Sequence, residues 1–256
     1  MSPVPGWTKS ALLEVQEYVL MVGKVGRACV TRPFYFRDMI EQFESIGVGS
    51  LTVVLLTGMF TGMVLALQSG ITLDKFGARS MVGQLVSASM VKELGPVLTG
   101  LIVAGRVGSG IAAELGSMMV TEQIAALRAL GTDPIRKLVL PRLLAGLFMV
   151  PVLTVVSCGI GMVGAWIVTI TQLKVPSSVY WNSVVAGLYI QDVWMGLIKP
   201  FFIGFTITSI GCHVGMRTYG GTQGVGRATT NAVVAASVAV IAVDFLVTKL
   251  LIAMMY

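Results

Sequence analysis

Four charged residues stand within or at the edge of stretches that are otherwise apolar: Lys92, Glu93, Lys199 and Asp244. Side chains of this kind can hold the phosphate headgroup of a lipid, or they can neutralise one another as links between helices. Because a charge at the centre of a membrane costs roughly 2.5–3.5 kcal/mol on insertion scales, we expect the four to meet as one polar cluster. The sequence leaves both roles open.

Residue combinations typical of enzyme sites are missing from the sequence. It has no GxxxxGK[ST] loop for nucleotide phosphates and no GxSxG elbow, and its one histidine, His213, excludes an HExxH zinc site. The three cysteines lie far apart, so neither a disulfide framework nor a metal site is expected. Gly159, Gly161 and Gly164 spell GxGxxG within an apolar stretch, where helix packing is the better interpretation.

The composition argues against a soluble enzyme. Hydrophobic residues make up 55% of the 256 residues and charged residues 12%, about half of the roughly 25% that is usual in soluble domains. The net charge of +6 can indicate nucleic acid, but in so apolar a chain it favours basic loops beside anionic lipid. We therefore expect no nucleic-acid partner.

Five apolar stretches, each long enough to cross a bilayer, predict five membrane-spanning helices. They cover residues 47–70, 94–115, 143–173, 194–216 and 229–256. Apolar and polar residues do not alternate along these stretches as they do in barrel strands, so the predicted fold class is an all-α integral membrane protein. Arg106 and Glu114 interrupt the second span, and we expect each to find its partner on another helix.

The positions of lysine and arginine predict the orientation. Eleven lie before the first span or in the loops after the second and fourth spans, and four lie in the loops on the other side. Cytoplasmic loops carry the excess of positive charge. The N-terminus is therefore predicted to be cytoplasmic and the C-terminus to lie outside.

The N-terminal segment, residues 9–30, is too charged to span a membrane. Leu12, Val15, Val19 and Val22 fall on one helical face, which predicts an amphipathic helix lying in the cytoplasmic interface. A soluble helix packed on the rest of the protein is the alternative. We accordingly divide the chain into an N-terminal interfacial region, 1–45, and a five-span domain, 46–256.

The loop between the second and third spans predicts a short helix, capped by Thr121 and ended by Gly131. Its apolar ridge would comprise Ile124, Leu127 and Leu130, and its polar side Glu122, Gln123 and Arg128. Such a helix can dock on another protein or rest on lipid, and its composition does not decide between the two.

Small residues recur at every fourth position in the first two spans, which predicts close helix packing. They are Gly58, Gly62, Ala66 and Gly70 in the first span, and Gly100, Ala104, Gly108, Ala112 and Gly116 in the second.

Four short segments between residues 92 and 134 are distinctive. They are Glu93-Leu94-Gly95-Pro96, Ala104-Gly105-Arg106-Val107-Gly108, Ala113-Glu114-Leu115-Gly116 and Thr121-Glu122-Gln123-Ile124. Together they resemble the signature of the MlaE/YrbE family of lipid-transport ABC permeases, and the five spans and the length extend the resemblance over nearly the whole chain.

This resemblance implies a non-catalytic permease that works as a homodimer in the bacterial inner membrane. Its implied partners are a cytoplasmic ATPase pair that binds ATP and magnesium, often a STAS-domain protein, a periplasmic ring of MCE-domain proteins, and the phospholipid that is moved. No cofactor is implied in this chain.

The resemblance also implies roles for particular residues. The short loop helix would be the coupling helix that docks on the ATPase, through Glu122, Ile124, Leu127, Arg128 and Leu130. The charged residues Lys92, Glu93, Lys199 and Asp244 would lie near a lipid cavity at the dimer interface.

Two other functions are alternatives. An integral-membrane lipid-modifying enzyme would need a histidine–carboxylate or paired-acid site at headgroup level. A secondary transporter would show inverted repeats, into which five spans do not divide.

Overall fold

The structure is a computed structural model that describes residues 6–28 and 35–255. Helices account for nearly all of these residues. The α-helices are α1 (Gly6–Ala28), α2 (Phe36–Asp74), α3 (Val82–Ser89), α4 (Gly95–Val103), α5 (Ser109–Val120), α6 (Gln123–Ala129), α7 (Leu140–Thr171), α8 (Ser177–Ala186), α9 (Ile190–Met216) and α10 (Gly221–Met255). Four shorter helical segments are η1 (Arg79–Met81), η2 (Met90–Leu94), η3 (Ala104–Gly108) and η4 (Ile135–Val139). Within the described ranges no strand occurs, which confirms the all-α prediction.

Five helical stretches are long and apolar enough to cross a membrane, as predicted: Phe36–Asp74, Arg79–Val120, Ile135–Thr171, Ile190–Met216 and Gly221–Met254. All five begin before the predicted apolar stretches do, because the charged turns that precede those stretches are also helical. The 39 residues of α2 measure about 58 Å at 1.5 Å per residue, against roughly 30 Å of hydrocarbon. The predicted division between residues 45 and 46 falls inside this continuous helix.

The second span is a chain of helical segments rather than one regular helix. Two of these, η2 and η3, are π-helical turns within the α-helix. A π-turn adds a residue to the helical repeat, and such turns are frequent at functional sites. Here η2 carries Lys92 and Glu93, and η3 carries Arg106.

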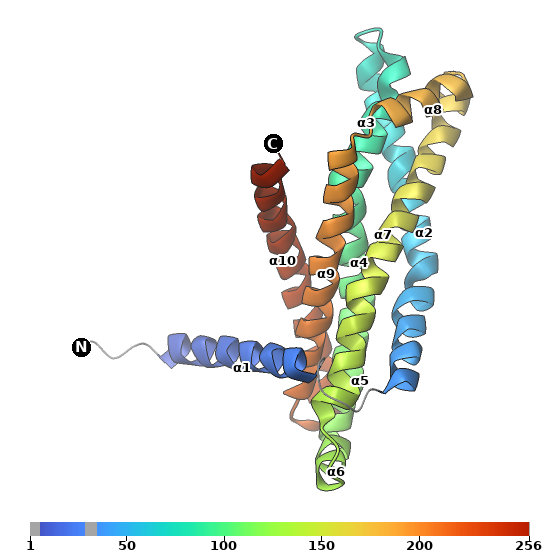
Figure 1. Cartoon of the computed structure of the whole chain (residues 1–256). Helices are drawn as coiled ribbons and strands as arrows, with labels where there is room; N and C mark the ends of the chain where they lie inside the picture. Colours follow the sequence, from blue (N-terminus) through green and yellow to red (C-terminus); the bar gives the residue numbers. More distant parts are fainter. Residues whose placement is uncertain (1–5, 29–34, 256) are drawn as a thin grey trace, which may run out of the picture.

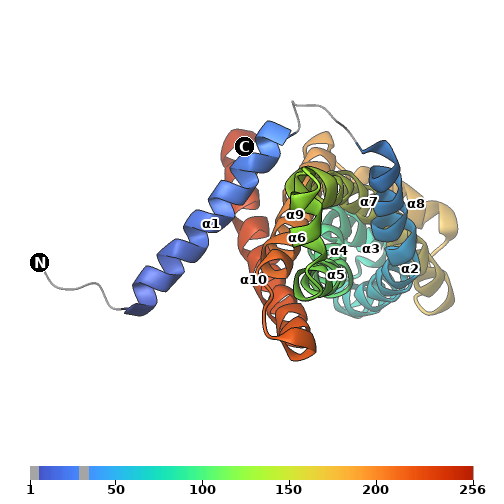
Figure 2. The same cartoon turned by 90° about the horizontal axis from the view of Figure 1, so that it is seen from below.

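The spans form one elongated bundle (Figure 1). In it α7 packs against both α2 and α9, and α9 also contacts α5 and α10. Viewed along the bundle, α2 and α10 lie on opposite sides (Figure 2). The short helix α6 projects at one end, here named the α6 end, and α8 lies at the other, the α8 end.

The helix α8 was not predicted from the sequence. It packs on α3 at the α8 end of the bundle. Its buried Tyr180 donates a hydrogen bond to the carbonyl of Met162 on α7 at 2.8 Å. Because that carbonyl removes the cost of burying the hydroxyl group, α8 is held as part of the core.

The N-terminal helix α1 runs roughly perpendicular to the bundle near the α6 end, with its C-terminal part against the bundle and its N-terminal part extending away from it (Figure 1). Tyr18 shares a 2.7 Å hydrogen bond with Ser209 of α9, whereas Val15 and Val19 are exposed. A soluble packed helix would bury those two valines. The arrangement therefore fits the predicted interfacial helix, whose outward face would meet lipid. The side chain of Leu12 lies outside the described residues.

Close backbone contacts join the first and third spans. A Cβ atom added to Gly62 of α2 would overlap the carbonyl oxygen of Gly161 on α7, and one at Gly58 would lie 2.8 Å from the carbonyl oxygen of Ser157. The same kind of contact joins α7 to α9, where a Cβ at Gly204 would overlap the carbonyl of Gly146. Small residues at these positions let backbones touch.

The second span is less tightly packed at one of its predicted positions. A Cβ at Gly100 would come within 2.7 Å of Ile203 Cγ2, but a Cβ at Gly108 would lie 3.5 Å from Ile207 Cγ2, an ordinary contact. A methyl group therefore fits at Gly108 itself, although the backbone there does lie close to α9: a Cβ at Gly211 would lie 3.0 Å from the carbonyl oxygen of Gly108.

These contacts predict different outcomes for two alanine substitutions. Gly62→Ala should lower the stability of the folded protein by about 1–3 kcal/mol, the usual cost of overpacking. Gly108→Ala, which adds the same methyl group to a span, should leave stability unchanged and serves as the matched control. Thermal unfolding in one detergent measures both. Equal melting temperatures for the two variants would contradict the assigned contact between α2 and α7.

Candidate functional site

The ammonium group of Lys199 on α9 is 0% exposed and has three polar partners on other helices. Its Nζ atom lies 2.8 Å from Glu93 Oε1 of η2 and 3.6 Å from Asp244 Oδ1 of α10. It also donates a 2.7 Å hydrogen bond to the backbone carbonyl of Lys92. One side chain thus links three of the five spans.

The carbonyl of Lys92 can accept this bond because of a proline. Pro96 stands four residues later and has no backbone N–H group, so the donor that an α-helix would normally offer to that carbonyl is missing. The π-turn η2 widens the helix at the same place. The sequence Glu93-Leu94-Gly95-Pro96 therefore supplies both a carboxylate and a bare carbonyl to Lys199.

The ammonium group of Lys92 does not join this cluster, which corrects the expectation that all four charges meet. Its Nζ lies 2.8 Å from Asp192 Oδ1 in the first turn of α9, and the Asp192 side chain is 1% exposed. A carboxylate is favourable at a helix N-terminus. Sequence reasoning missed Asp192 because it precedes the apolar stretch. Its spacing of seven residues from Lys199 was the available signal, since that spacing places both on one helical face.

The Lys199 cluster, defined as Lys199, Glu93 and Asp244, opens to the surface of the chain through Glu93. The Glu93 side chain is 46% exposed, whereas that of Asp244 is 12% exposed. The cluster contains two carboxylates and one ammonium group. A half-exposed carboxylate in a membrane span is costly against lipid tails, so its open side requires a polar neighbour.

Arg106 and Glu114, the two charges that interrupt the second span, each have a partner on another helix, as expected. Glu114 Oε1 of α5 lies 2.7 Å from Nη2 of Arg142, a buried residue of α7. Arg106 Nη1 donates hydrogen bonds to Ser50 Oγ at 2.8 Å and to the carbonyl of Ser45 at 3.2 Å, both on α2. Each charge in the second span therefore fastens that span to a neighbour.

The short loop helix is present as α6 at one tip of the molecule, but its ends differ from the prediction. Thr121 does not cap it: its hydroxyl donates to the carbonyl of Ser117 at 2.8 Å. The N-cap residue is Glu122, in the left-handed conformation with φ of 59°. Gly131 follows the helix with φ of +75°, a conformation that favours glycine, so the predicted stop is confirmed.

The predicted ridge on α6 does not face outward as a unit. Ile124 is 1% exposed and lies in the apolar core of the same chain, and Leu127 packs half-buried against that core. Only Leu130, at 80% exposed, is open to a partner. The prediction that Ile124 belongs to a docking surface is therefore wrong, because its side chain is buried within the same chain. The exposed residues Glu122, Arg128 and Leu130 remain available for that predicted role.

The single histidine lies in a polar setting that attaches α1. The ring of His213 stands edge-on to Tyr18, with ring centroids 5.5 Å apart. Nearby, Arg217 makes ion pairs with Glu14 at 3.8 Å and with Glu17 at 3.1 Å. These carboxylates hold the helix α1, and their arrangement gives no support to the lipid-modifying enzyme.

Comparison with known proteins agrees with this architecture. The family described as Permease MlaE matches residues 39–250. A protein of Rickettsia typhi described as "Probable ABC transporter permease protein" is 44% identical over 219 residues, covering 86% of this chain and 85% of that protein. The intermembrane phospholipid transport system permease protein MlaE of Haemophilus influenzae is 35% identical over 235 residues, covering 91% and 89%. The chloroplastic protein TRIGALACTOSYLDIACYLGLYCEROL 1 of Arabidopsis thaliana is 34% identical over 230 residues, covering 90% of this chain and 66% of that protein. The chain therefore belongs to the MlaE permease family.

Proposed function

We propose that this chain is the transmembrane subunit of an ATP-driven transporter that moves phospholipid between the inner membrane and the cell envelope. The observation that carries the proposal is a polar cluster, open at Glu93, within an apolar five-span bundle of this family. The Haemophilus influenzae relative, whose name states phospholipid transport, supports the substrate class. A lipid needs an apolar path for its tails and a few polar groups for its headgroup, and this bundle offers apolar spans and a polar cluster.

The proposed active form is a homodimer. The half-exposed Glu93 carboxylate needs a polar neighbour within the membrane, and a second copy facing it would enclose a polar cavity between ten spans. The last span, α10, supports this arrangement, because only 17% of its most apolar window is buried within one chain. Such a surface is available both to a second copy and to lipid.

A cytoplasmic ATPase is the proposed source of energy, since this chain has no phosphate-binding loop of its own. ATP and magnesium would be bound by that partner, which would dock on α6 at Glu122, Arg128 and Leu130. The same helix inserts Ile124 into the core of the permease. A push on α6 would therefore reach the spans through packed side chains rather than through a loose loop.

The α8 end is the proposed site for an MCE-domain ring on the periplasmic side, and a STAS-domain protein is a further proposed partner on the ATPase side. Exposed apolar side chains at this end support the proposal: Phe76, Val185, Tyr189 and Ile190. Since they lie in or beside the connections of α2 and α8, they are placed for a partner beyond the membrane surface.

The function is tested by reconstituting the chain with its ATPase in vesicles that contain fluorescent phospholipid. ATP-dependent movement of the lipid to acceptor vesicles carrying the MCE-domain protein is the expected result. Mass spectrometry of lipid retained by the purified complex identifies the substrate. ATP hydrolysis with no lipid movement and no retained phospholipid would contradict the proposal.

The proposed orientation places the N-terminus in the cytoplasm and the C-terminus in the periplasm. A fluorescent reporter that matures only in the cytoplasm should be dark when fused after Tyr256 and bright when fused before Met1. The second fusion is the control for expression. Bright fluorescence from both fusions would contradict a chain with five spans.

The exposed end of α6 gives a sharp test of coupling. Leu130→Asp should leave the permease folded, because this side chain is exposed, but should abolish permease-dependent ATP hydrolysis and co-purification of the ATPase. Ile124→Asp should instead prevent folding, since it buries an unpaired charge. Phe76→Asp, a similarly exposed change at the α8 end, is the control in assays that leave out the MCE-domain protein, because Phe76 belongs to the surface proposed for that protein. Full ATP hydrolysis by the Leu130→Asp complex would show that α6 is not the docking element.

The Lys199 cluster predicts an order of stabilities. Asp244→Asn leaves the pair of Lys199 and Glu93 in place and should cost about 1 kcal/mol. Lys199→Met leaves two carboxylates without their cation and should cost about 3–5 kcal/mol. Chemical unfolding in detergent measures both variants. Equal losses would mean that Lys199 is not the centre of the cluster.

Transport measurements separate a structural role of this cluster from contact with lipid. The double variant Lys199→Met with Asp244→Leu should regain most of the stability lost in Lys199→Met, because no buried carboxylate is left unpaired and Glu93 still opens to the proposed polar cavity. If the cluster is mainly structural and borders the cavity, as we expect, transport should recover with stability. A stable double variant that does not transport would assign the cluster to the lipid path.

A further inference from the structure

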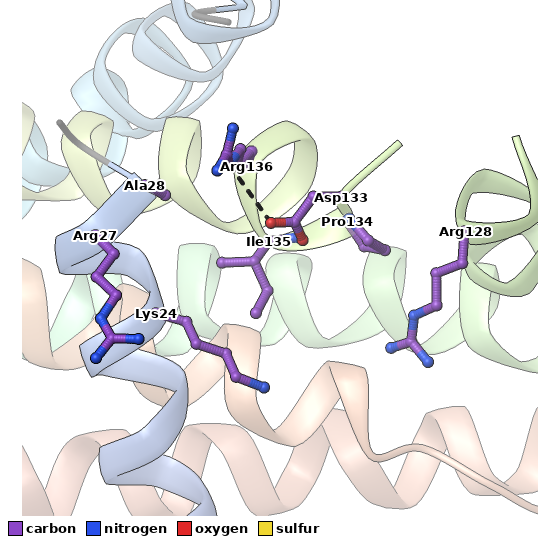
Figure 3. Close-up of a pocket in the computed structure, with 8 residues that line it drawn as sticks. All are labelled: Lys24, Arg27, Ala28, Arg128, Asp133, Pro134, Ile135 and Arg136. Atoms are coloured by element: carbon purple, nitrogen blue, oxygen red, sulfur yellow. Dashed lines mark hydrogen bonds and ion pairs between the residues drawn. The ribbon is translucent and has the colours of Figure 1, made fainter. Parts of the chain in front are cut away.

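A basic hollow lies between the interfacial helix and the coupling element, at the α6 end. Its volume is about 510 Å³, and it is formed by the end of α1, the end of α6 and the start of η4. The residues that line it are Lys24, Arg27, Ala28, Arg128, Asp133, Pro134, Ile135 and Arg136 (Figure 3). Four of them are cations and one is a carboxylate.

The one carboxylate already has partners. Asp133 Oδ1 accepts a hydrogen bond from the amide of Ile135 at 3.0 Å, and Asp133 Oδ2 lies 3.6 Å from Arg136 Nε. For Lys24 and Arg128, the structure shows no acidic partner within the part of the chain that it describes. Both side chains are exposed, and they extend toward the same opening from opposite walls (Figure 3). The hollow therefore keeps an excess of positive charge.

The helix α1, as the proposed interfacial helix, would set the level of this hollow relative to the membrane. Its outward valines, Val15 and Val19, suit the boundary between headgroups and tails. Lys24 and Arg27 follow on the same helix, so they lie at about the same depth. Ile135 and Ala28 add an apolar wall, which suits the glycerol and upper acyl region below a phosphate.

We propose that this hollow binds the phosphodiester headgroup of an anionic phospholipid of the cytoplasmic leaflet, as a resident lipid that is not transported. Basic pockets between membrane helices on the cytoplasmic side are suited to acidic headgroups, and guanidinium groups pair well with phosphate oxygens. Two of the cations stand on α1, which lies beside the bundle rather than beyond its tip. This position favours a lipid over an acidic segment of a docked protein. The proposal rests on the proposed orientation.

Such a lipid would bridge α1 and α6, which no ion pair joins directly within the described residues. Lys24 belongs to the interfacial helix and Arg128 to α6, the element that is proposed to receive the ATPase. The single negative charge of the phosphodiester would lie between them and offset their repulsion, and its removal would leave two like charges facing one hollow. The resident lipid would thus fix α6 against α1.

The test uses the purified permease alone, so that it does not depend on transport. The protein is placed in phosphatidylcholine nanodiscs that contain a few spin-labelled phosphatidylglycerol molecules, and the immobilised fraction is measured by electron paramagnetic resonance. Lys24→Gln with Arg128→Gln removes two exposed charges. Arg37→Gln with Arg227→Gln is the control, since it removes two exposed charges from the same end outside the hollow.

The hollow variant should bind the spin-labelled lipid about twenty-fivefold more weakly, at roughly fivefold for each cation removed near an anionic surface. The control variant should bind it nearly as the wild type does. Arg128→Glu alone should give a comparable loss, and unchanged melting temperatures exclude misfolding. Equal lipid binding by the hollow variant and the control would overturn the proposal.

Two further measurements distinguish other occupants. Binding of inorganic phosphate, measured by equilibrium dialysis in phosphatidylcholine nanodiscs, should be negligible. If wild-type protein binds phosphate and the hollow variant does not, the occupant of the hollow is a free anion rather than a lipid. Lys24→Gln alone leaves the proposed docking residue Arg128 in place; if this variant keeps the lipid but no longer retains the ATPase, the hollow belongs to a protein partner. Either result overturns the proposal while leaving the transport function to its own test.

Discussion

The buried ammonium group of Lys199 is the constraint on which the arrangement of the spans depends. An ammonium ion without partners has no tolerable position inside a membrane bundle, so the surrounding helices must bring oxygen atoms to it. Glu93 and Asp244 contribute carboxylates from the second and fifth spans, and the Lys92 carbonyl adds a third partner. The π-turn and the proline of the second span serve this requirement, because they make the Lys92 carbonyl available to Lys199.

The spans could be predicted from the sequence because a bilayer imposes a single length scale on apolar stretches. Their ends could not, because a helix does not stop where the apolar residues stop. In α2 the first turns continue through Arg37 and Glu41, which pair at 3.3 Å one helical turn apart. The helix α8 was missed for a related reason: ten residues are too few to give a membrane signal, and its anchor is a tertiary contact of Tyr180.

In the candidate site too, composition predicted which residues matter, whereas their contacts depend on the geometry of the fold. Charged residues within apolar stretches pointed correctly to Lys199, Glu93 and Asp244, since each has to find a partner. Asp192 escaped notice because its burial depends on how α9 begins. The helical period correctly placed Ile124 and Leu127 on one face of α6, but periodicity does not say which way a face turns. Only the fold shows that this face turns inward.

The contacts between backbones at Gly62 and Gly161, and at Gly146 and Gly204, have a mechanical consequence. Helices whose peptide groups touch cannot slide along each other without breaking that fit, because no flexible side chains lie between them to absorb the shift. The helices α2, α7 and α9 therefore act as one stiff plate. A conformational change in this bundle must move these three helices as one unit.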